Sequence, residues 1–257
     1  MEKEPTSGRP PLLHPLRRAL HSSHTTVAIL AAAGSSRRMQ GGNKLFLPLC
    51  GKPVLAHTLL AFEKSRLISG ILLVGKEEDF PAIRELLSTY GIEKSLLLVP
   101  GGKTRQESVR NALDAIGEYR LESKISYVAI ADGDRPLTTP DMIDRVVQTA
   151  FTFGAASAGC PATDTVKLTD ASGYIEQTPD RSNTWLAQTP QVFRLAAYQA
   201  AAYTAEAEGY AATDDNALLE RIGIPVRMVD CGPHNLKITR PGDLEIAQTL
   251  LALKGGH

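Results

Sequence analysis

The sequence predicts an α/β fold in which helices flank a mostly parallel sheet, with a β-hairpin arm protruding from it. Short apolar runs rich in β-branched residues alternate with segments whose apolar residues recur every three or four positions, as in successive strand–helix units. The alternation breaks once, between Gly159 and Gln191, where prolines and a glycine punctuate short pieces of alternating polarity. The 257 residues suffice for a self-sufficient core.

The first 25 residues are expected to form a flexible tail ahead of a single domain over residues 26–257. Prolines, arginines and hydroxyl residues stand there without the continuous apolar stretch of a secretory signal. An organellar transit peptide, against which Glu2 and Glu4 argue, or a start codon placed too far upstream would give the same pattern.

The elements expected before the break alternate regularly. The strands are 27–32, 70–74, 95–99 and 127–130, and the helices are 54–64, 81–90, 105–116 and 141–151. Thr104 and Thr139 are expected to cap two of these helices, because each precedes an acidic residue or a proline in a first helical turn. After the break come helices 195–208 and 214–222, a strand 226–229 and a final helix 241–253.

The break itself, residues 159–191, is predicted to be a hairpin excursion, whose arm spans approximately 160–184. Long excursions from compact domains are often functional or reach a partner, and a tolerated surface insertion is the alternative.

A cationic loop follows the first strand. The small residues Ala32-Ala33-Gly34 let backbone N–H groups approach phosphate oxygens, and Arg37, Arg38 and Lys44 add full positive charge. This pattern predicts a loop that binds the polyphosphate of a nucleotide, and an ordinary connection with solvated arginines is the alternative.

Two familiar nucleotide-binding fingerprints are absent. Ser36 and Met39 stand where a dinucleotide-binding loop needs its second and third glycines. Gly102-Lys103-Thr104 looks like the end of a P-loop, but Leu97 stands where the first glycine is required.

Acidic residues follow the fourth strand. Ligands of open parallel sheets bind outside the carboxyl ends of the strands, which places Asp132, Asp134 and Arg135 at the same edge as the cationic loop. Magnesium bound to a triphosphate needs only one or two protein carboxylates, and Asp132 is the first candidate. The alternative is that Asp132 caps the next turn and Asp134 pairs with Arg135 at the surface.

Charge and cysteine usage exclude several classes of protein. Lys plus Arg and Asp plus Glu both number 28, so no global field attracts nucleic acid or an anionic membrane. No apolar run reaches the ~20 residues that span a bilayer. The three widely spaced cysteines fit a reducing compartment, and a cytoplasmic location is expected.

Taken together, these segments resemble the 2-C-methyl-D-erythritol 4-phosphate cytidylyltransferases of the non-mevalonate isoprenoid pathway, over residues 27 to about 250. The resemblance is carried by Ala32-Ala33-Gly34 with Arg37-Arg38-Met39 and Lys44, Gly101-Gly102 with Arg105 and Ser108, Asp132 with Arg135-Pro136, Asp164-Thr165-Val166-Lys167, Asp180-Arg181, Thr189-Pro190-Gln191, Thr213-Asp214 and Lys237-Ile238-Thr239-Arg240. It implies a Rossmann-like fold of the nucleotide-diphospho-sugar transferase type.

The resemblance also implies a reaction. A phosphate oxygen of the polyol phosphate attacks the α-phosphorus of CTP, releasing pyrophosphate, with a divalent cation such as Mg²⁺ held at Asp132. Arg38 and Lys44 match the transition-state stabilisers, and Arg181 and Lys237 match the residues that orient the acceptor phosphate.

The remaining residues implied by the resemblance bind substrate. They are Ala32, Ala33, Gly34, Arg37, Gly102, Arg105, Ser108, Asp132, Arg135, Thr165 and Thr189. Thr165 and Arg181 lie on the arm, which in the family crosses to a second subunit, so a homodimer is expected.

The sequence departs from the family pattern in three places, one of which is His234, where an acidic residue is common before Asn235. Ala131, Gly133 and Asp134 surround Asp132 where the family usually carries histidine and two small residues, and Asn43-Lys44-Leu45 replaces Pro-Lys-Gln after a shorter connection. Two other functions therefore stay open: a cytidylyltransferase for another polyol phosphate such as ribitol 5-phosphate, and a catalytically silent nucleotide-binding module.

Overall fold

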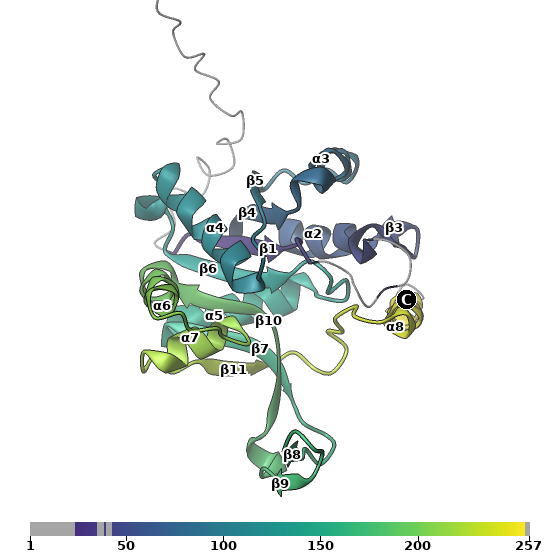
Figure 1. The fold of residues 1–257 in the computed structure, drawn as a ribbon. Coiled ribbons are helices and arrows are strands. Elements are labelled where there is room, and N and C mark those ends of the chain that lie inside the picture. Colours follow the sequence, from purple (N-terminus) through teal and green to yellow (C-terminus); the bar gives the residue numbers. More distant parts are fainter. Residues whose placement is uncertain (1–23, 35–38, 40–42, 255–257) are drawn as a thin grey trace, which may run out of the picture.

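A seven-stranded sheet forms the centre of the computed structural model, which describes residues 24–34, 39 and 43–254 (Figure 1). The strand order is β11-β7-β10-β6-β1-β4-β5, and only β10 runs antiparallel to its neighbours. The strands are β1 (Thr26–Ala31), β4 (Ile68–Gly75), β5 (Ser95–Pro100), β6 (Tyr127–Asp132), β7 (Ala155–Pro161), β10 (Trp185–Arg194) and β11 (Arg227–Asp230). The predicted mostly parallel sheet is confirmed.

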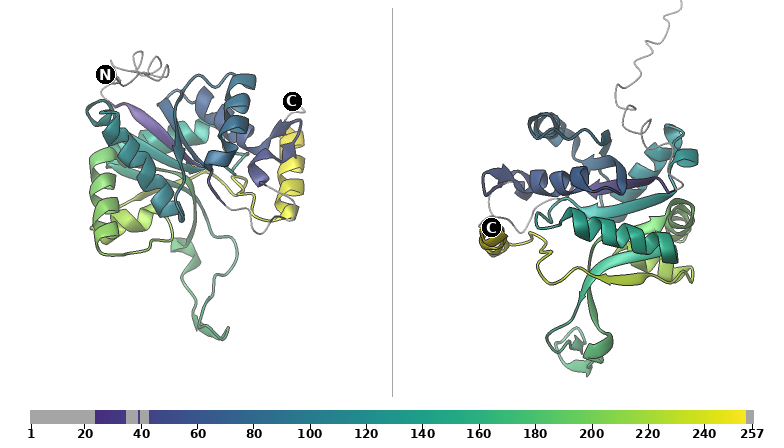
Figure 2. Two further views of the ribbon diagram at one scale, coloured as in Figure 1. Left: turned by 45° about the horizontal axis from the view of Figure 1, so that its top comes forward. Right: turned by 180° about the vertical axis from the view of Figure 1, so that it is seen from behind.

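Helices cover both faces of the sheet (Figures 1 and 2). Ala28 and Leu30 of β1 pack with α2 (Val54–Lys64), α3 (Phe80–Thr89) and α5 (Pro140–Phe153). Val27 and Ile29 face the other way, toward α4 (Arg105–Glu118), α6 (Leu195–Ala207) and α7 (Asp215–Arg221). The strand's buried residues thus alternate between two cores, and the result is a three-layer structure.

The two threonine caps form as the sequence predicts. The Thr104 hydroxyl accepts a hydrogen bond from the Glu107 backbone N–H at 3.0 Å, which fixes the start of α4. The Thr139 hydroxyl accepts from Met142 N–H at 3.2 Å, and Pro140 opens α5. Each cap satisfies a backbone donor that the first helical turn leaves unpaired.

The predicted excursion over residues 159–191 is too long at both ends, because β7 and β10 belong to the central sheet. The end of this excursion that contains Pro190 is predicted to be a loop, because proline rarely occupies a central strand. The structure accommodates Pro190 where the pairing of β10 with β7 shifts register, between Ala187 and Gln191. Pairing with β6 begins only at Gln191, so Pro190 interrupts no continuous ladder.

Residues 162–184, called the arm below, extend from β7 and β10 away from the body of the protein (Figures 1 and 2). The arm contains β8 (Leu168–Thr169), β9 (Ile175–Gln177) and the short helix η4 (Arg181–Asn183). Leu168, Tyr174 and Ile175 are 47%, 76% and 62% exposed, so the arm presents apolar side chains to solvent.

A third, smaller core holds the C-terminal segment against the body. It joins α8 (Pro241–Lys254) to the hairpin of β2 (Pro48–Leu49) and β3 (Lys52–Pro53), through buried residues that include Leu49, Leu137 and Ile238. The short helices η1 (Lys44–Phe46), η2 (Glu77–Asp79) and η3 (Glu122–Lys124) complete the fold. Because Ile238 is fully buried, its neighbour Lys237 is fixed close to the end of β6.

Candidate active site

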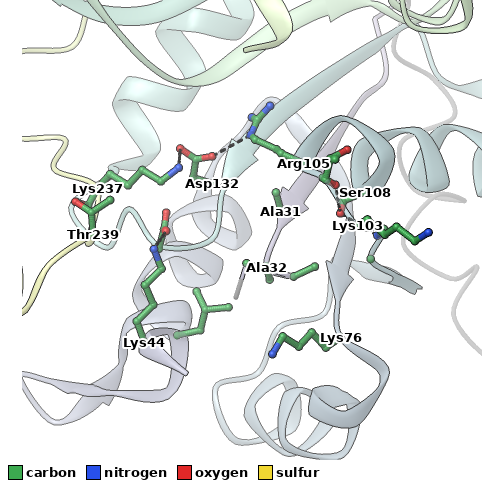
Figure 3. Close-up of a pocket in the computed structure, with 17 residues that line it drawn as sticks. Ala31, Ala32, Lys44, Lys76, Lys103, Arg105, Ser108, Asp132, Lys237 and Thr239 are labelled. Carbon is green, nitrogen blue, oxygen red and sulfur yellow. Dashed lines mark hydrogen bonds and ion pairs between the residues drawn. The ribbon is translucent and has the colours of Figure 1, made fainter. Parts of the chain in front are cut away.

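A cavity of about 760 Å³ lies outside the carboxyl ends of β1, β4, β5 and β6 (Figure 3). Lys44, Lys237 and Thr239 stand on one side of it, and Lys76, Lys103 and Ser108 stand on the other. Five cationic and two carboxylate side chains line its described part: Lys44, Lys76, Lys103, Arg105, Lys237, Asp132 and Asp134. The excess of positive charge suits a polyanionic ligand.

The floor of the cavity consists of closely packed loops. Ala32 N–H donates to the Val74 carbonyl at 2.7 Å, which ties the loop after β1 to β4. A Cβ on Gly101 would lie 2.2 Å from the Cβ of Ala33, so only glycine permits this approach. The Ser108 hydroxyl accepts from Gly102 N–H at 3.0 Å and fixes the loop before α4.

Lys44 lies on the wall formed by the C-terminal segment and is 9% exposed. Its Nζ donates to the Ile238 carbonyl at 2.7 Å and forms an ion pair with Asp134. The backbone before it is fixed by Asn43, whose side chain caps η1 through Leu45 N–H and donates to Asp79 at 2.8 Å. The described start of η1 therefore holds Lys44 in a defined place.

Asp132 is the centre of the charge network. Its carboxylate accepts from Arg135 Nε at 3.0 Å, pairs with Lys237 Nζ at 3.2 Å and pairs with Arg105 Nε at 3.4 Å. Burial alone would raise the pKa of Asp132, but Lys237, Arg105 and Arg135 outweigh it and hold the pKa well below its usual range. Asp132 is therefore negatively charged at neutral pH.

Two buried side chains, Asp215 and Tyr198, hold Arg105 in place. Its Nη1 donates to Asp215 Oδ2 at 2.5 Å, and the Tyr198 hydroxyl donates to Asp215 Oδ1 at 2.6 Å. Burial is the main cause that raises the pKa of Tyr198 well above its usual value, and Asp215 adds to it. Because Asp215 is 2% exposed, it fixes the guanidinium without itself touching the cavity.

Removing the Tyr198 hydroxyl tests this support. We expect Tyr198→Phe to lower the free energy of unfolding by about 1–3 kcal/mol, because a buried carboxylate oxygen loses its hydrogen bond. The matched control is Tyr203→Phe, whose hydroxyl donates to exposed Asp114 at 2.9 Å. Urea unfolding of both variants provides the comparison, and equal effects would mean that burial of the Asp215 pair adds nothing.

Most of the predicted site residues meet in one cavity. Its lining includes Ala32, Ala33, Gly34, Lys44, Gly102, Arg105, Ser108, Asp132 and Lys237. Arg135 and Thr189 lie behind it: Arg135 contacts Asp132, and the Thr189 hydroxyl accepts from Asp132 N–H at 3.1 Å. Arg37 and Arg38 lie outside the described residues.

Thr165 and Arg181 do not line this cavity, because both belong to the arm. Arg181 Nη1 donates to the Thr163 carbonyl at 3.2 Å within the arm itself, and Arg181 is not among the residues that line the cavity. Within one chain the two predicted acceptor-binding groups are thus separated from Lys237.

Several lining residues were not predicted to function. Lys76 directly follows β4, so the rule that places ligands at the carboxyl ends of strands, if applied to this strand, would have found it. The sequence pattern indicates Lys103 only as part of an incomplete P-loop. Asp214 caps α7, but the contact of Asp215 with Arg105 carries no signal in the sequence.

The chemistry of the site fits a divalent cation that arrives with a triphosphate. No cluster of three or more His, Cys, Asp or Glu side chains suited to a metal exists among the described residues. Asp132 and Asp134 both line the cavity, and the Oδ1 atom of Asp134 is buried without a hydrogen-bond partner. One or two carboxylates suffice for magnesium that keeps phosphate oxygens and water as its other ligands.

Comparisons with known proteins agree with this geometry. The chain matches the family model described as 2-C-methyl-D-erythritol 4-phosphate cytidylyltransferase over residues 26–253. A protein of that name from Parasynechococcus marenigrum is 44% identical over 227 residues, which cover 88% of this chain and 97% of the relative. One from Syntrophus aciditrophicus is 43% identical over 233 residues, which cover 90% and 97%.

Solved structures give the same result. The crystal structure of 4-diphosphocytidyl-2C-methyl-D-erythritol synthase from Anaerococcus prevotii superposes with a TM-score of 0.78 at 28% identity, covering 89% of this chain and 96% of that one. The Thermus thermophilus 2-C-methyl-D-erythritol 4-phosphate cytidylyltransferase superposes with a TM-score of 0.69 at 29% identity, covering 87% and 98%.

Proposed function

The chain belongs to the 2-C-methyl-D-erythritol 4-phosphate cytidylyltransferase family, and we propose that its cationic cavity is the site at which CMP is transferred from CTP to 2-C-methyl-D-erythritol 4-phosphate. The products are 4-diphosphocytidyl-2-C-methyl-D-erythritol and pyrophosphate. The observation that carries this assignment is the arrangement of Lys44 and Lys237 around Asp132 at the ends of the parallel strands.

The reaction needs charge stabilisation more than covalent chemistry. An oxygen of the acceptor phosphate attacks the α-phosphorus of CTP as the bond to pyrophosphate breaks, and negative charge develops on the equatorial and leaving oxygens. Lys44 lies where it can donate to those oxygens, and Arg38 from the adjacent loop is the second stabiliser in this proposal. Pyrophosphate leaves with the electron pair of the broken bond.

Lys237 orients the acceptor phosphate. Its ammonium pairs with Asp132 at 3.2 Å and its side chain is 35% exposed, so it is anchored and still accessible from the cavity. One carboxylate oxygen of Asp132 pairs with Lys237, which contacts the acceptor, and the other pairs with Arg105.

The cytosine and ribose are assigned to the Ala32–Gly34 backbone and to the loop that precedes α4. Ala32 N–H is paired with the Val74 carbonyl, whereas Ala33 and Gly34 are not buried, and their small size leaves backbone groups accessible to a base edge. Gly102, Arg105 and Ser108 supply the remaining polar groups from one loop and the first turn of one helix.

Asp132 is the proposed holder of Mg²⁺, and Arg37 and Arg135 are assigned to support of the bound nucleotide. The cation, when bound, neutralises triphosphate charge and polarises the α-phosphoryl group. Lys44, Lys76 and Lys103 line the same cavity, where they would neutralise further phosphate charge.

The arm is assigned to a homodimer contact through which Thr165 and Arg181 complete the cavity of the partner. Two observations support it: both residues lie away from the cavity of their own chain, and the arm exposes Leu168, Tyr174 and Ile175. An apolar surface on a projecting segment is typical of a protein–protein contact.

Mixed dimers test the shared cavity. Lys44→Ala and Arg181→Ala homodimers should each be nearly inactive, and mixing them should restore activity, since one site of each mixed dimer then combines an intact body with an intact arm. Arg181→Ala alone should weaken acceptor binding while CTP affinity stays close to that of the unmodified protein. Steady-state rates after subunit exchange provide the measurement, and no recovery would contradict the crossing arm.

Acceptor identity is tested by competition. Pyrophosphate release should be faster with 2-C-methyl-D-erythritol 4-phosphate than with ribitol 5-phosphate when both are offered at equal concentration. A preference for ribitol 5-phosphate would overturn the acceptor assignment and leave the assignment of CTP as the CMP donor unchanged. CTP binding without turnover under magnesium would instead identify a silent nucleotide-binding module.

A cytoplasmic location is part of the proposal. All three cysteines are free thiols, of which Cys160 and Cys231 are buried, and this agrees with a reducing compartment. In the part of the chain that the structure describes, no helix is both long and apolar enough to cross a membrane.

A further inference from the structure

Asp134 joins three segments that are far apart in the sequence. Its carboxylate pairs with Lys44 Nζ, and its backbone carbonyl accepts from Ile238 N–H at 2.9 Å. Lys44 Nζ in turn donates to the Ile238 carbonyl at 2.7 Å. The three residues therefore form a closed ring of contacts among η1, the turn after β6 and the C-terminal segment that carries Lys237.

The Lys44–Asp134 pair is largely shielded from solvent. The side chains are 11% and 9% exposed, so screening by water and salt is weak. Asp134 Oδ1 is buried without a hydrogen-bond partner, and the other carboxylate oxygen, Oδ2, pairs with Lys44. A buried carboxylate with this environment favours one position of the lysine strongly.

We propose that Asp134 is a positioning residue for Lys44: it fixes the ammonium at the cavity wall before CTP binds and links its position to that of Lys237. A lysine side chain has four rotatable bonds, and ordering it in the transition state costs conformational entropy. The contacts with Asp134 and Ile238 order the lysine side chain when the enzyme folds. The entropy cost of ordering it is therefore not added to the barrier of the reaction.

The pair is a long-range contact. Asp134 and Lys44 are ninety residues apart in the sequence and in direct contact. Asp134 lies in the turn after β6, whereas Lys44 begins η1. The carboxylate thus anchors the lysine to the end of the central sheet.

The inference rests on the proposed role of Lys44, and a double-mutant cycle separates the two. The full-length variants are Asp134→Ala, Asp134→Asn, Lys44→Ala and the double variant Asp134→Ala with Lys44→Ala, assayed with CTP, 2-C-methyl-D-erythritol 4-phosphate and Mg²⁺. Asp134→Asn keeps the size of the side chain and an oxygen acceptor, so it remains informative if Asp134→Ala fails to fold. The matched control is Asp144→Asn, whose carboxylate accepts from the Ser65 hydroxyl at 2.6 Å and does not line the cavity.

We expect Asp134→Ala to lower kcat about tenfold with an unchanged KM for CTP, and Asp134→Asn to recover part of that loss. In the Lys44→Ala background the same substitution should have no further effect, because the group that it positions is absent. Asp144→Asn should leave kcat unchanged.

Two results would overturn the inference alone. Asp134→Ala could keep the unmodified kcat while Lys44→Ala loses it, or Asp134→Ala could slow the Lys44→Ala variant as much as it slows the unmodified enzyme. A Lys44→Ala enzyme with full kcat would instead reject the proposed role of Lys44 itself.

Discussion

Lys44→Ala is expected to lower kcat by roughly 100-fold or more, since one donor aimed at developing charge contributes ~3 kcal/mol to the transition state. CTP affinity should fall much less, because Lys76, Lys103 and Arg105 still line the same cavity. The measurement is kcat by pyrophosphate release, together with Kd for CTP by calorimetry.

The matched control for this variant is Lys94→Ala. Lys94 also donates to a backbone carbonyl, that of Ser65 at 2.6 Å, but it lies outside the cavity. Its loss should leave kcat unchanged. Equal losses of kcat and CTP affinity in Lys44→Ala would contradict a role that is specific to the transition state.

Asp132→Ala is expected to have the second largest effect. Arg105, Arg135 and Lys237 would lose their common counter-ion, and we expect the free energy of unfolding to fall by about 3 kcal/mol at neutral pH. Turnover should be lost as well, because Lys237 is no longer held at the acceptor position. Asp132→Asn keeps the shape of the side chain and should restore part of the stability but little of the turnover.

The pH dependence of stability gives an independent check. The folded pKa of Asp132 lies below its unfolded value, so its contribution is complete above the unfolded pKa of about 4 and is lost as the pH falls through the folded pKa. The stability difference between the unmodified protein and Asp132→Ala should therefore shrink below about pH 4. A difference that does not change with pH, or no loss of stability at pH 7, would contradict the role of Asp132 as counter-ion.

Much of the cavity could be predicted from the sequence because it is built at strand ends. Asp132 is the last residue of β6, and Lys44 begins η1, the first helix after β1, so both lie near strand ends that a parallel sheet brings to one edge. Helices α2, α4 and α5 could be predicted because their apolar periodicity is a local feature, as are the threonine caps of α4 and α5.

The features that were missed depend on contacts distant in sequence. The central position of β10 could not be predicted, because Thr189-Pro190 and the neighbouring glutamines are typical of a loop. The register shift that accommodates them is seen only in the structure. Asp134 pairs with Lys44 and not with Arg135, because Ile238 fixes the C-terminal segment beside both. The support of Arg105 by Asp215 likewise arises only when α7 packs against α4.

Single-turnover transfer from CTP labelled at the α-phosphorus tests the central claim most directly. With excess enzyme, magnesium and 2-C-methyl-D-erythritol 4-phosphate, the label should pass into 4-diphosphocytidyl-2-C-methyl-D-erythritol in step with pyrophosphate release, and Lys44→Ala should slow this step while CTP stays bound. Retention of the label in enzyme-bound CTP by the unmodified protein would contradict the account, as would transfer that proceeds at the same rate without Lys44.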